Sequence, residues 1–112
     1  MKTLVLWGLV GLCGALFSNF RTMEINDWRI RIDELNQQLI DLLNKRASFA
    51  VEIGKLKKQM GLPVLDASRE EAVLERVGAL AESAQKSGGS LSPDSVKNIF
   101  RAIMEETRKV EK

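Results

Sequence analysis

Two basic side chains within an apolar stretch give the clearest indication of chemistry in this sequence. Arg46 lies between Leu42 and Phe49 in a row of apolar residues, and an unpaired guanidinium buried there would cost on the order of several kcal/mol. It therefore needs a carboxylate or an anionic ligand. Lys57 follows 11 residues later, and eleven helical steps of about 100° return to within roughly 20° of the same face. The two long side chains could converge on a small dianion placed between them.

Structural explanations stand beside the functional one. The Arg46 guanidinium could pair with Asp41 or another acid, or it could bend into solvent. Lys57 could belong to a solvated run of lysines near the end of a helix, where the helix dipole favours cations. Gly54, between the two, costs about 1 kcal/mol relative to Ala in a helix. Close approach of another helix or of a ligand would explain it, and we favour helix packing.

The composition restricts the chemistry that these residues can carry out. The 112 residues allow one domain and contain no His and one Cys. This excludes His-based proton shuttles, Ser-His-Asp and Cys-His dyads, an intrachain disulfide framework and Cys-based metal clusters. If the chain is an enzyme, it must work by positioning and fixed charge, or with carboxylates and lysines alone. Lys2 and Arg21 are the only charged residues before Met23, so residues 23–112 hold equal numbers of acids and bases, which argues against a nucleic-acid partner.

A single long helix must position the two basic residues. Apolar residues recur every three or four positions, with Arg46 filling one place in the row: Ile25, Trp28, Ile32, Leu35, Leu39, Leu42, Phe49, Ile53, Leu56 and Met60. This seam predicts a helix of about 37 residues. Asn26 or Asp27 is the candidate cap at its start, and Gly61 followed by Pro63 ends it. At about 55 Å it exceeds the width of a compact 90-residue domain, roughly 30 Å. A dimer in which two long helices pair would bury the seam.

Two shorter helices are predicted to follow. A loop over 61–66 leads into a helix over 67–86, for which Asp66 and Ser68 are the candidate caps. Its apolar face consists of Val73, Val77, Leu80, Ala81 and Ala84. Ser92 and Pro93 then open a third helix. Its stripe is Val96, Phe100, Ile103, Met104, Thr107 and Glu111. With no strand pattern in the chain, we expect an all-α fold of three helices.

The N-terminal segment differs from the rest of the chain. Residues 3–20 carry no charge, and as a helix they would reach roughly 27 Å, just enough for a thin bilayer. Residues 1–22 are interpreted as a signal peptide or anchor, as an upstream extension before a true start at Met23, or as a helix packed on the domain. The domain itself is assigned to residues 23–112. We expect a cytoplasmic protein if Met23 is the start, and otherwise an exported or membrane-anchored one, with membrane contact only through residues 1–22.

Five segments together resemble one enzyme family. They are Trp28-Arg-Ile-Arg-Ile-Asp33-Glu-Leu, Leu42-Leu-Asn-Lys-Arg46, Val51-Glu-Ile-Gly-Lys-Leu-Lys57, Pro63-Val-Leu-Asp66 and Arg69-Glu70. In order and spacing they resemble the all-helical (AroQ-class, type II) chorismate mutases, over about residues 24–112. The resemblance implies an intertwined homodimer of three-helix chains. It also implies the Claisen rearrangement of chorismate to prephenate in phenylalanine and tyrosine biosynthesis, a reaction that needs no nucleophile, metal, cofactor or proton shuttle.

The resemblance further implies a role for each site residue. Arg46 would bind one substrate carboxylate, and Arg29 would reach over from the other subunit to bind a carboxylate. Lys57 would contact the ether oxygen and a carboxylate. Asp66 and Glu70 would hold the ring hydroxyl of the substrate.

Five further positions complete the implied site. Arg69 would support the carboxylate cluster, and Thr107 would line the pocket together with Ile53 and Met104. Glu111 falls where many bacterial members carry a Gln that donates a hydrogen bond to the ether oxygen. A carboxylate cannot donate until it is protonated, so we expect Glu111 to act in its protonated form.

Two alternatives remain for the function. Isochorismate pyruvate lyase shares the fold and the basic pocket, although Asp66 and the Arg69-Glu70 pair favour the mutase. The chain could also be a non-catalytic helical dimerisation module tethered by residues 1–22. An inert seam, however, has no need of Arg46.

Overall fold

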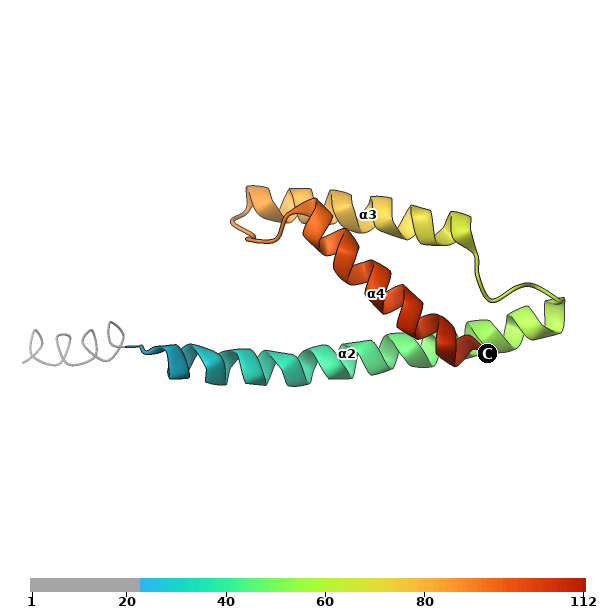
Figure 1. Ribbon diagram of the computed structural model, residues 1–112, viewed down its shortest axis with the longest axis horizontal. Helices are drawn as coiled ribbons and strands as arrows, with labels where there is room; N and C mark the ends of the chain where they lie inside the picture. The colour runs from blue at the N-terminus through green and yellow to red at the C-terminus, as the bar shows by residue number, and fades with distance from the viewer. Residues whose placement is uncertain (1–22) are drawn as a thin grey trace, which may run out of the picture. The chain divides into compact units, whose positions relative to one another are not determined.

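Three α-helices make up the described part of the chain. The computed structural model describes residues 23–112, and its helices are α2 (Ile25–Met60), α3 (Ala67–Lys86) and α4 (Pro93–Glu111) (Figure 1). Residues 23–112 contain no strand, so the prediction of an all-α fold is confirmed. The predicted signal, anchor or upstream extension, residues 1–22, lies outside the described residues. Of the helices described, none combines the length and the apolar character that a membrane crossing requires.

The described chain falls into two units that meet within α2, one up to Ile40 and the other Asp41–Lys112. In the first unit, the start of α2 is fixed by its own first turn. The Asp27 carboxylate accepts a hydrogen bond from the backbone N–H of Glu24 at 2.8 Å, as the acid of a capping box does from the third helical position. The helix therefore begins at Ile25, and the prediction that Asn26 or Asp27 is the cap was wrong by two or three residues.

The apolar seam of α2 is exposed in the single chain. Its exposed fractions run from 49% at Ile53 to 69% at Met60, and every other apolar member falls between these values. A long row of apolar side chains on a surface is typical of an interaction site. The seam therefore remains available to a partner in both units.

In the second unit, α3 and α4 pack against each other (Figure 1). Val77 and Ala81 of α3 and Met104 of α4 are buried there, and Ala50 of α2 is buried as well. Leu80, predicted to belong to the apolar face of α3, is 60% exposed. It lies about 100° around the helix from Ala81, so it points away from the buried stripe.

Glycines terminate two of the helices. Gly61 has a positive φ of 68°, the left-handed conformation that glycine adopts at low cost. The N–H of Leu62 donates to the Lys57 carbonyl at 2.8 Å, and that of Gly61 donates to the Lys58 carbonyl at 3.3 Å. This pair of bonds is a Schellman motif. Gly88, with a φ of 99°, ends α3 in the same way, so α3 stops at Lys86 as predicted.

Side-chain caps start the other two helices. The Asp66 carboxylate accepts a hydrogen bond from the backbone N–H of Arg69 at 3.0 Å, so Asp66 rather than Ser68 is the cap of α3. The Ser68 hydroxyl instead donates to the Asp66 carboxylate at 3.0 Å. The Ser92 hydroxyl accepts from the N–H of Ser95 at 3.1 Å, ahead of a proline in the first turn, as predicted.

Gly54 allows the end of α4 to lie against α2. It is buried, and a Cβ atom added there would overlap the backbone carbonyl oxygen and Cα of Glu111. Helix packing is therefore the reason for a glycine in the middle of α2, as favoured from the sequence. The contact fixes the position of Glu111 along the axis of α2.

Candidate active site

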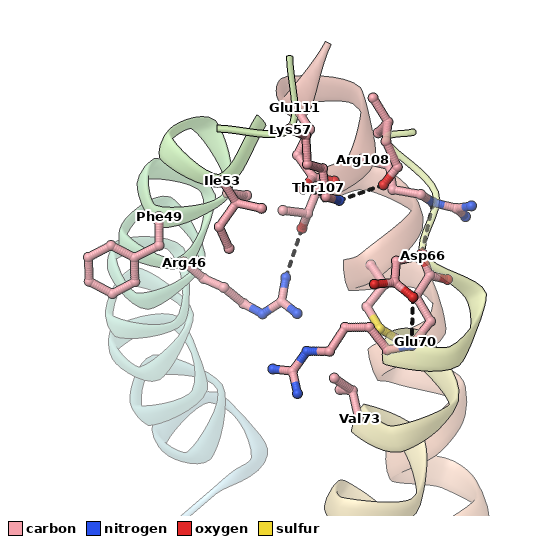
Figure 2. Close-up of a pocket in the computed structure, with 14 residues that line it drawn as sticks. Arg46, Phe49, Ile53, Lys57, Asp66, Glu70, Val73, Thr107, Arg108 and Glu111 are labelled. Atoms are coloured by element: carbon pink, nitrogen blue, oxygen red, sulfur yellow. Dashed lines mark hydrogen bonds and ion pairs between the residues drawn. The ribbon is translucent and has the colours of Figure 1, made fainter. Parts of the chain in front are cut away.

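One cavity of about 440 Å³ lies in the second unit, within the size range of small-molecule sites. It is lined by Arg46, Phe49, Ala50, Ile53, Lys57, Val64, Asp66, Arg69, Glu70, Val73, Met104, Thr107, Arg108 and Glu111. Every predicted site residue except Arg29 is in this set. Figure 2 shows that the charged side chains converge from α2, α3 and α4.

Arg46 enters the cavity without an acidic partner. Its Nη1 donates a hydrogen bond to the Thr107 hydroxyl at 3.1 Å (Figure 2). Thr107 in turn donates to the backbone carbonyl of Ile103, so an oxygen lone pair faces the guanidinium. The expected ion pair of Arg46 with Asp41 does not form, and no other acid of residues 23–112 takes its place. A half-buried cation that meets only a hydroxyl is suited to receive an anion.

Lys57 is held from two sides. Its Nζ lies 2.9 Å from Oε1 of Glu111 and 2.6 Å from the backbone carbonyl oxygen of Val64. The side chains of Lys57 and Glu111 are only 17% and 10% exposed. The alternative in which Lys57 belongs to a solvated run is therefore wrong, although it describes Lys55, which pairs with Glu52 at the surface.

Glu70 and Arg108 link α3 to α4 at the cavity wall. Oε2 of Glu70 lies 3.4 Å from Nε of Arg108, and both side chains are partly buried (Figure 2). Sequence reasoning missed Arg108, because a basic residue in the last turn of a helix is explained by the helix dipole. One signal was present: Arg108 follows Met104 by four residues and so shares its face of the helix.

Asp66 and Arg69 lie at the N-terminus of α3. The backbone N–H of Arg69 and, to a smaller extent, the Ser68 hydroxyl hydrogen-bond to the Asp66 carboxylate and lower its pKa below the ordinary value of 3.8. Asp66 is therefore an ionised acceptor at neutral pH. Arg69 lines the same cavity and, among residues 23–112, forms no ion pair through its guanidinium.

Apolar side chains complete the walls. Met104 is 6% exposed and belongs to the buried stripe of α4, whereas Ile53 is 49% exposed. Both line the cavity, together with Phe49, Val64 and Val73. No group of three acidic, His or Cys side chains in residues 23–112 is arranged to hold a metal ion.

Arg29 is the one predicted site residue outside the cavity. It is exposed on α2 in the first unit. Its predicted contact with a substrate bound by the other subunit stays a prediction.

The three helices and the charged cavity define a class of helical proteins with a site for an anionic small molecule. Comparison with known proteins shows which family this is. Residues 28–112 match the family described as chorismate mutase type II, and the chain belongs to this family. A T-protein from Haemophilus influenzae is 36% identical over 83 residues, which are 74% of this chain and 21% of that protein. A bifunctional chorismate mutase/prephenate dehydratase from Aquifex aeolicus is 29% identical over 89 residues, 80% of this chain and 24% of that protein.

A solved structure agrees with the sequence relatives. The form II chorismate mutase from Thermus thermophilus superposes with a TM-score of 0.68 and is 28% identical. The match covers 78% of this chain and 92% of that chain. By contrast, the chain spans only about a fifth to a quarter of the length of the curated relatives named above.

Proposed function

We propose that this protein is a chorismate mutase, which rearranges chorismate to prephenate in the biosynthesis of phenylalanine and tyrosine. The observation that carries the proposal is the Arg46 guanidinium, which faces the cavity with the Thr107 hydroxyl as its partner and pairs with no acid of residues 23–112. Family membership over residues 28–112 supports the same activity. The names of relatives, which pair chorismate mutase with prephenate dehydratase, support the pathway.

The charges of the cavity suit a substrate with two carboxylates. Of its four basic residues, Lys57 and Arg108 are each paired with an acid. Arg46 and Arg69 are not paired with any acid in residues 23–112. Two guanidiniums therefore stand ready for two carboxylates, each of which can accept strong charge-assisted hydrogen bonds.

Lys57 can serve the reacting atoms without leaving its partners. An ammonium group has three N–H donors, and two of them are used by Glu111 and by the Val64 carbonyl. The third can point at the substrate. In the rearrangement the ether C–O bond breaks while a C–C bond forms, and negative charge grows on the ether oxygen. A fixed ammonium beside this oxygen stabilises that charge.

Geometry supplies the remainder of the catalysis. The cavity holds the substrate in the compact conformer in which the two carbon atoms that will bond are close together, and such positioning can lower a barrier by up to about 7–11 kcal/mol in favourable models. Asp66 and Glu70 provide acceptors for the ring hydroxyl. Glu111 would donate to the ether oxygen only after it takes up a proton, and this role stays a prediction because its carboxylate here accepts from Lys57.

The proposal includes a homodimer with interlocked long helices. The exposed seam of α2 supports it, because ten apolar side chains at heptad spacing would be covered by a second α2. In this arrangement Arg29 of one chain would contribute to the site of the other.

The test is an assay of the purified protein with chorismate and, in parallel, isochorismate. We expect prephenate from chorismate, identified by chromatography and NMR, and little pyruvate from isochorismate. Lys45 is an exposed neighbour of Arg46. Lys45→Gln is therefore the matched control for the loss of positive charge in an Arg46→Gln variant. Pyruvate as the main product would favour the lyase, and no turnover of either compound would favour the dimerisation module.

A further inference from the structure

The ion pair between Glu70 and Arg108 crosses from one helix to another at the wall of the cavity. Nε of Arg108 on α4 lies 3.4 Å from Oε2 of Glu70 on α3, with the two side chains 32% and 25% exposed. Both residues line the cavity. Neither the family resemblance nor the charge pattern gives Arg108 a role in the reaction.

We propose that Arg108 is a positioning residue, which holds the Glu70 carboxylate in the orientation that accepts the hydroxyl group of the substrate. This inference rests on the proposed function, because it assumes a hydroxylated dicarboxylate in the cavity. Arg108 acts through Glu70 and does not itself need to touch the substrate.

The oxygen atoms of Glu70 have separate environments. Oε2 makes the ion pair with Arg108, and no other ion pair of Glu70 occurs within residues 23–112. Oε1 is thus left to accept a hydrogen bond from a ligand in the cavity. A glutamate side chain has several rotatable bonds, and ordering it without a partner costs conformational entropy. The contact from α4 removes that freedom before the substrate arrives, which is the benefit of preorganisation.

Comparison with the next residue, Lys109, shows that attraction to the helix dipole does not explain the contact of Arg108 with Glu70. Lys109 lies in the same last turn of α4 and interacts equally well with the dipole. Its partner is Glu106, one turn back on the same helix, and both side chains are more than 60% exposed. Arg108 instead reaches a carboxylate on α3 inside the cavity. Lys109 and Glu106 therefore form a matched control pair outside the site.

The experiment compares Arg108→Gln, Arg108→Lys and Lys109→Gln with the wild type by steady-state kinetics on chorismate. For Arg108→Gln we expect KM to rise roughly tenfold, the usual size of a lost charge-assisted contact, with kcat changed less than about threefold. Lys109→Gln should keep wild-type values. Arg108→Lys should restore KM to within about threefold, because the contact runs through a single nitrogen and not through the two-pronged end of the guanidinium.

A double-mutant cycle with Glu70→Gln tests whether Arg108 acts through Glu70. In the Glu70→Gln background, Arg108→Gln should raise KM less than about twofold, since no carboxylate remains to be oriented. An equal effect of Arg108→Gln in both backgrounds would overturn the inference. So would an Arg108→Gln variant that matches Lys109→Gln.

Failure of the proposed function gives a different result. If the wild type forms no prephenate, calorimetric titration with chorismate replaces kinetics, and the same variants should show the same ratios in Kd. A wild type that neither converts nor binds chorismate contradicts both proposals. An active wild type with an unaffected Arg108→Gln variant contradicts only the inference about Arg108.

Discussion

Arg46 carries a positive charge into the cavity of this chorismate mutase family member, where the Thr107 hydroxyl is its one side-chain hydrogen-bond partner among the described residues. A charge without an acid contributes little to folding, and its replacement should not destabilise the protein. The same charge is the main attraction for a carboxylate. Function and stability should therefore respond in different ways when Arg46 is changed.

We predict that Arg46→Gln lowers kcat/KM by roughly a hundredfold, as expected for the loss of a charged partner in a partly buried site. The free energy of unfolding should stay within about 1 kcal/mol of the wild type. Thr107→Val, which keeps the charge but removes the acceptor, should cost roughly tenfold in kcat/KM. Urea denaturation and prephenate assays measure both quantities. A variant that unfolds easily would assign Arg46 a structural role instead.

The ionisation of Asp66 should make the stability of the protein depend on pH. Its pKa is lowered mainly by the backbone N–H of Arg69 and also by the Ser68 hydroxyl. A carboxyl whose pKa is depressed by folding adds stability above its unfolded pKa and loses it as the pH falls through the folded pKa. The contribution is thus present at neutral pH and fades below the ordinary value of 3.8.

We therefore expect the Tm of the wild type to fall more steeply than that of Asp66→Asn between about pH 4 and pH 2. Asn caps a helix about as well as Asp, so the comparison isolates the ionisation. Ser68→Ala, which removes the weaker hydrogen bond, should give an intermediate slope. Parallel melting curves for wild type and Asp66→Asn would contradict the assignment.

Several residues of the site were accessible from the sequence, and others were not. Arg46 and Lys57 could be placed because a charge in an apolar row is rare and because helical spacing puts them on one face. The pairing of Lys57 with Glu111 could not, since it joins residues 54 positions apart whose contact depends on tertiary packing. Arg108 escaped because its sequence position has an adequate local explanation.

At the scale of elements, Gly54 sets the contact between α2 and the end of α4. Ala at this position would improve helix propensity by about 1 kcal/mol. Its methyl group, however, would overlap backbone atoms of Glu111, which cannot move aside as a flexible side chain could. The steric cost should exceed the gain, as overpacking typically costs about 1–3 kcal/mol.

We predict that Gly54→Ala lowers the free energy of unfolding by about 1–2 kcal/mol and lowers kcat, because Glu111 is pushed away from Lys57. Ser48→Ala is the control, since Ser48 is exposed on the same helix and its replacement by Ala also raises helix propensity. Chemical denaturation and kinetics report the two effects. A Gly54→Ala protein that is more stable than the wild type would refute the packing argument.

The elements themselves followed closely from local signals. The ends of α2 and α3 agree with prediction because Gly61 and Gly88 adopt positive φ values, which few other residues tolerate. The start of α4 follows from Ser92 and Pro93. The start of α2 was misplaced, because an acid in the first turn can bond backwards as well as forwards. Leu80 was wrongly assigned to the buried face of α3. The apolar residues of this helix cover a wide part of its circumference, and the sequence does not show which part of it α4 will cover.

At the scale of the whole molecule, the proposed dimer can be tested by complementation. Arg29→Gln and Arg46→Gln each remove one cation, and each variant alone should be nearly inactive. In a mixed dimer, one site would receive Arg46 from one chain and Arg29 from the other, and would be intact. Equal co-expression should then restore roughly a quarter of wild-type activity, since half of the dimers are mixed and each has one intact site.

The control for complementation is a mixture of Arg46→Gln with Thr107→Val. Both changes fall in the same cavity of one chain, so mixed dimers should show no gain beyond the average of the two variants. If Arg29 served the site of its own chain, co-expression of Arg29→Gln with Arg46→Gln would likewise give no gain. Sedimentation should report a dimer in each case.

The two guanidiniums of the cavity that have no acid partner in the described part of the chain also link catalysis to thermal stability. A dianion that binds Arg46 and Arg69 binds the folded protein and not the unfolded chain, so sulfate or phosphate should raise the Tm as its concentration increases. At one hundred times Kd, the free energy of unfolding should rise by about 2.7 kcal/mol. The same ions should inhibit competitively with an inhibition constant equal to that Kd. Arg46→Gln should abolish both effects together. The choice of buffer would then set the measured activity and the measured stability of this protein in opposite directions.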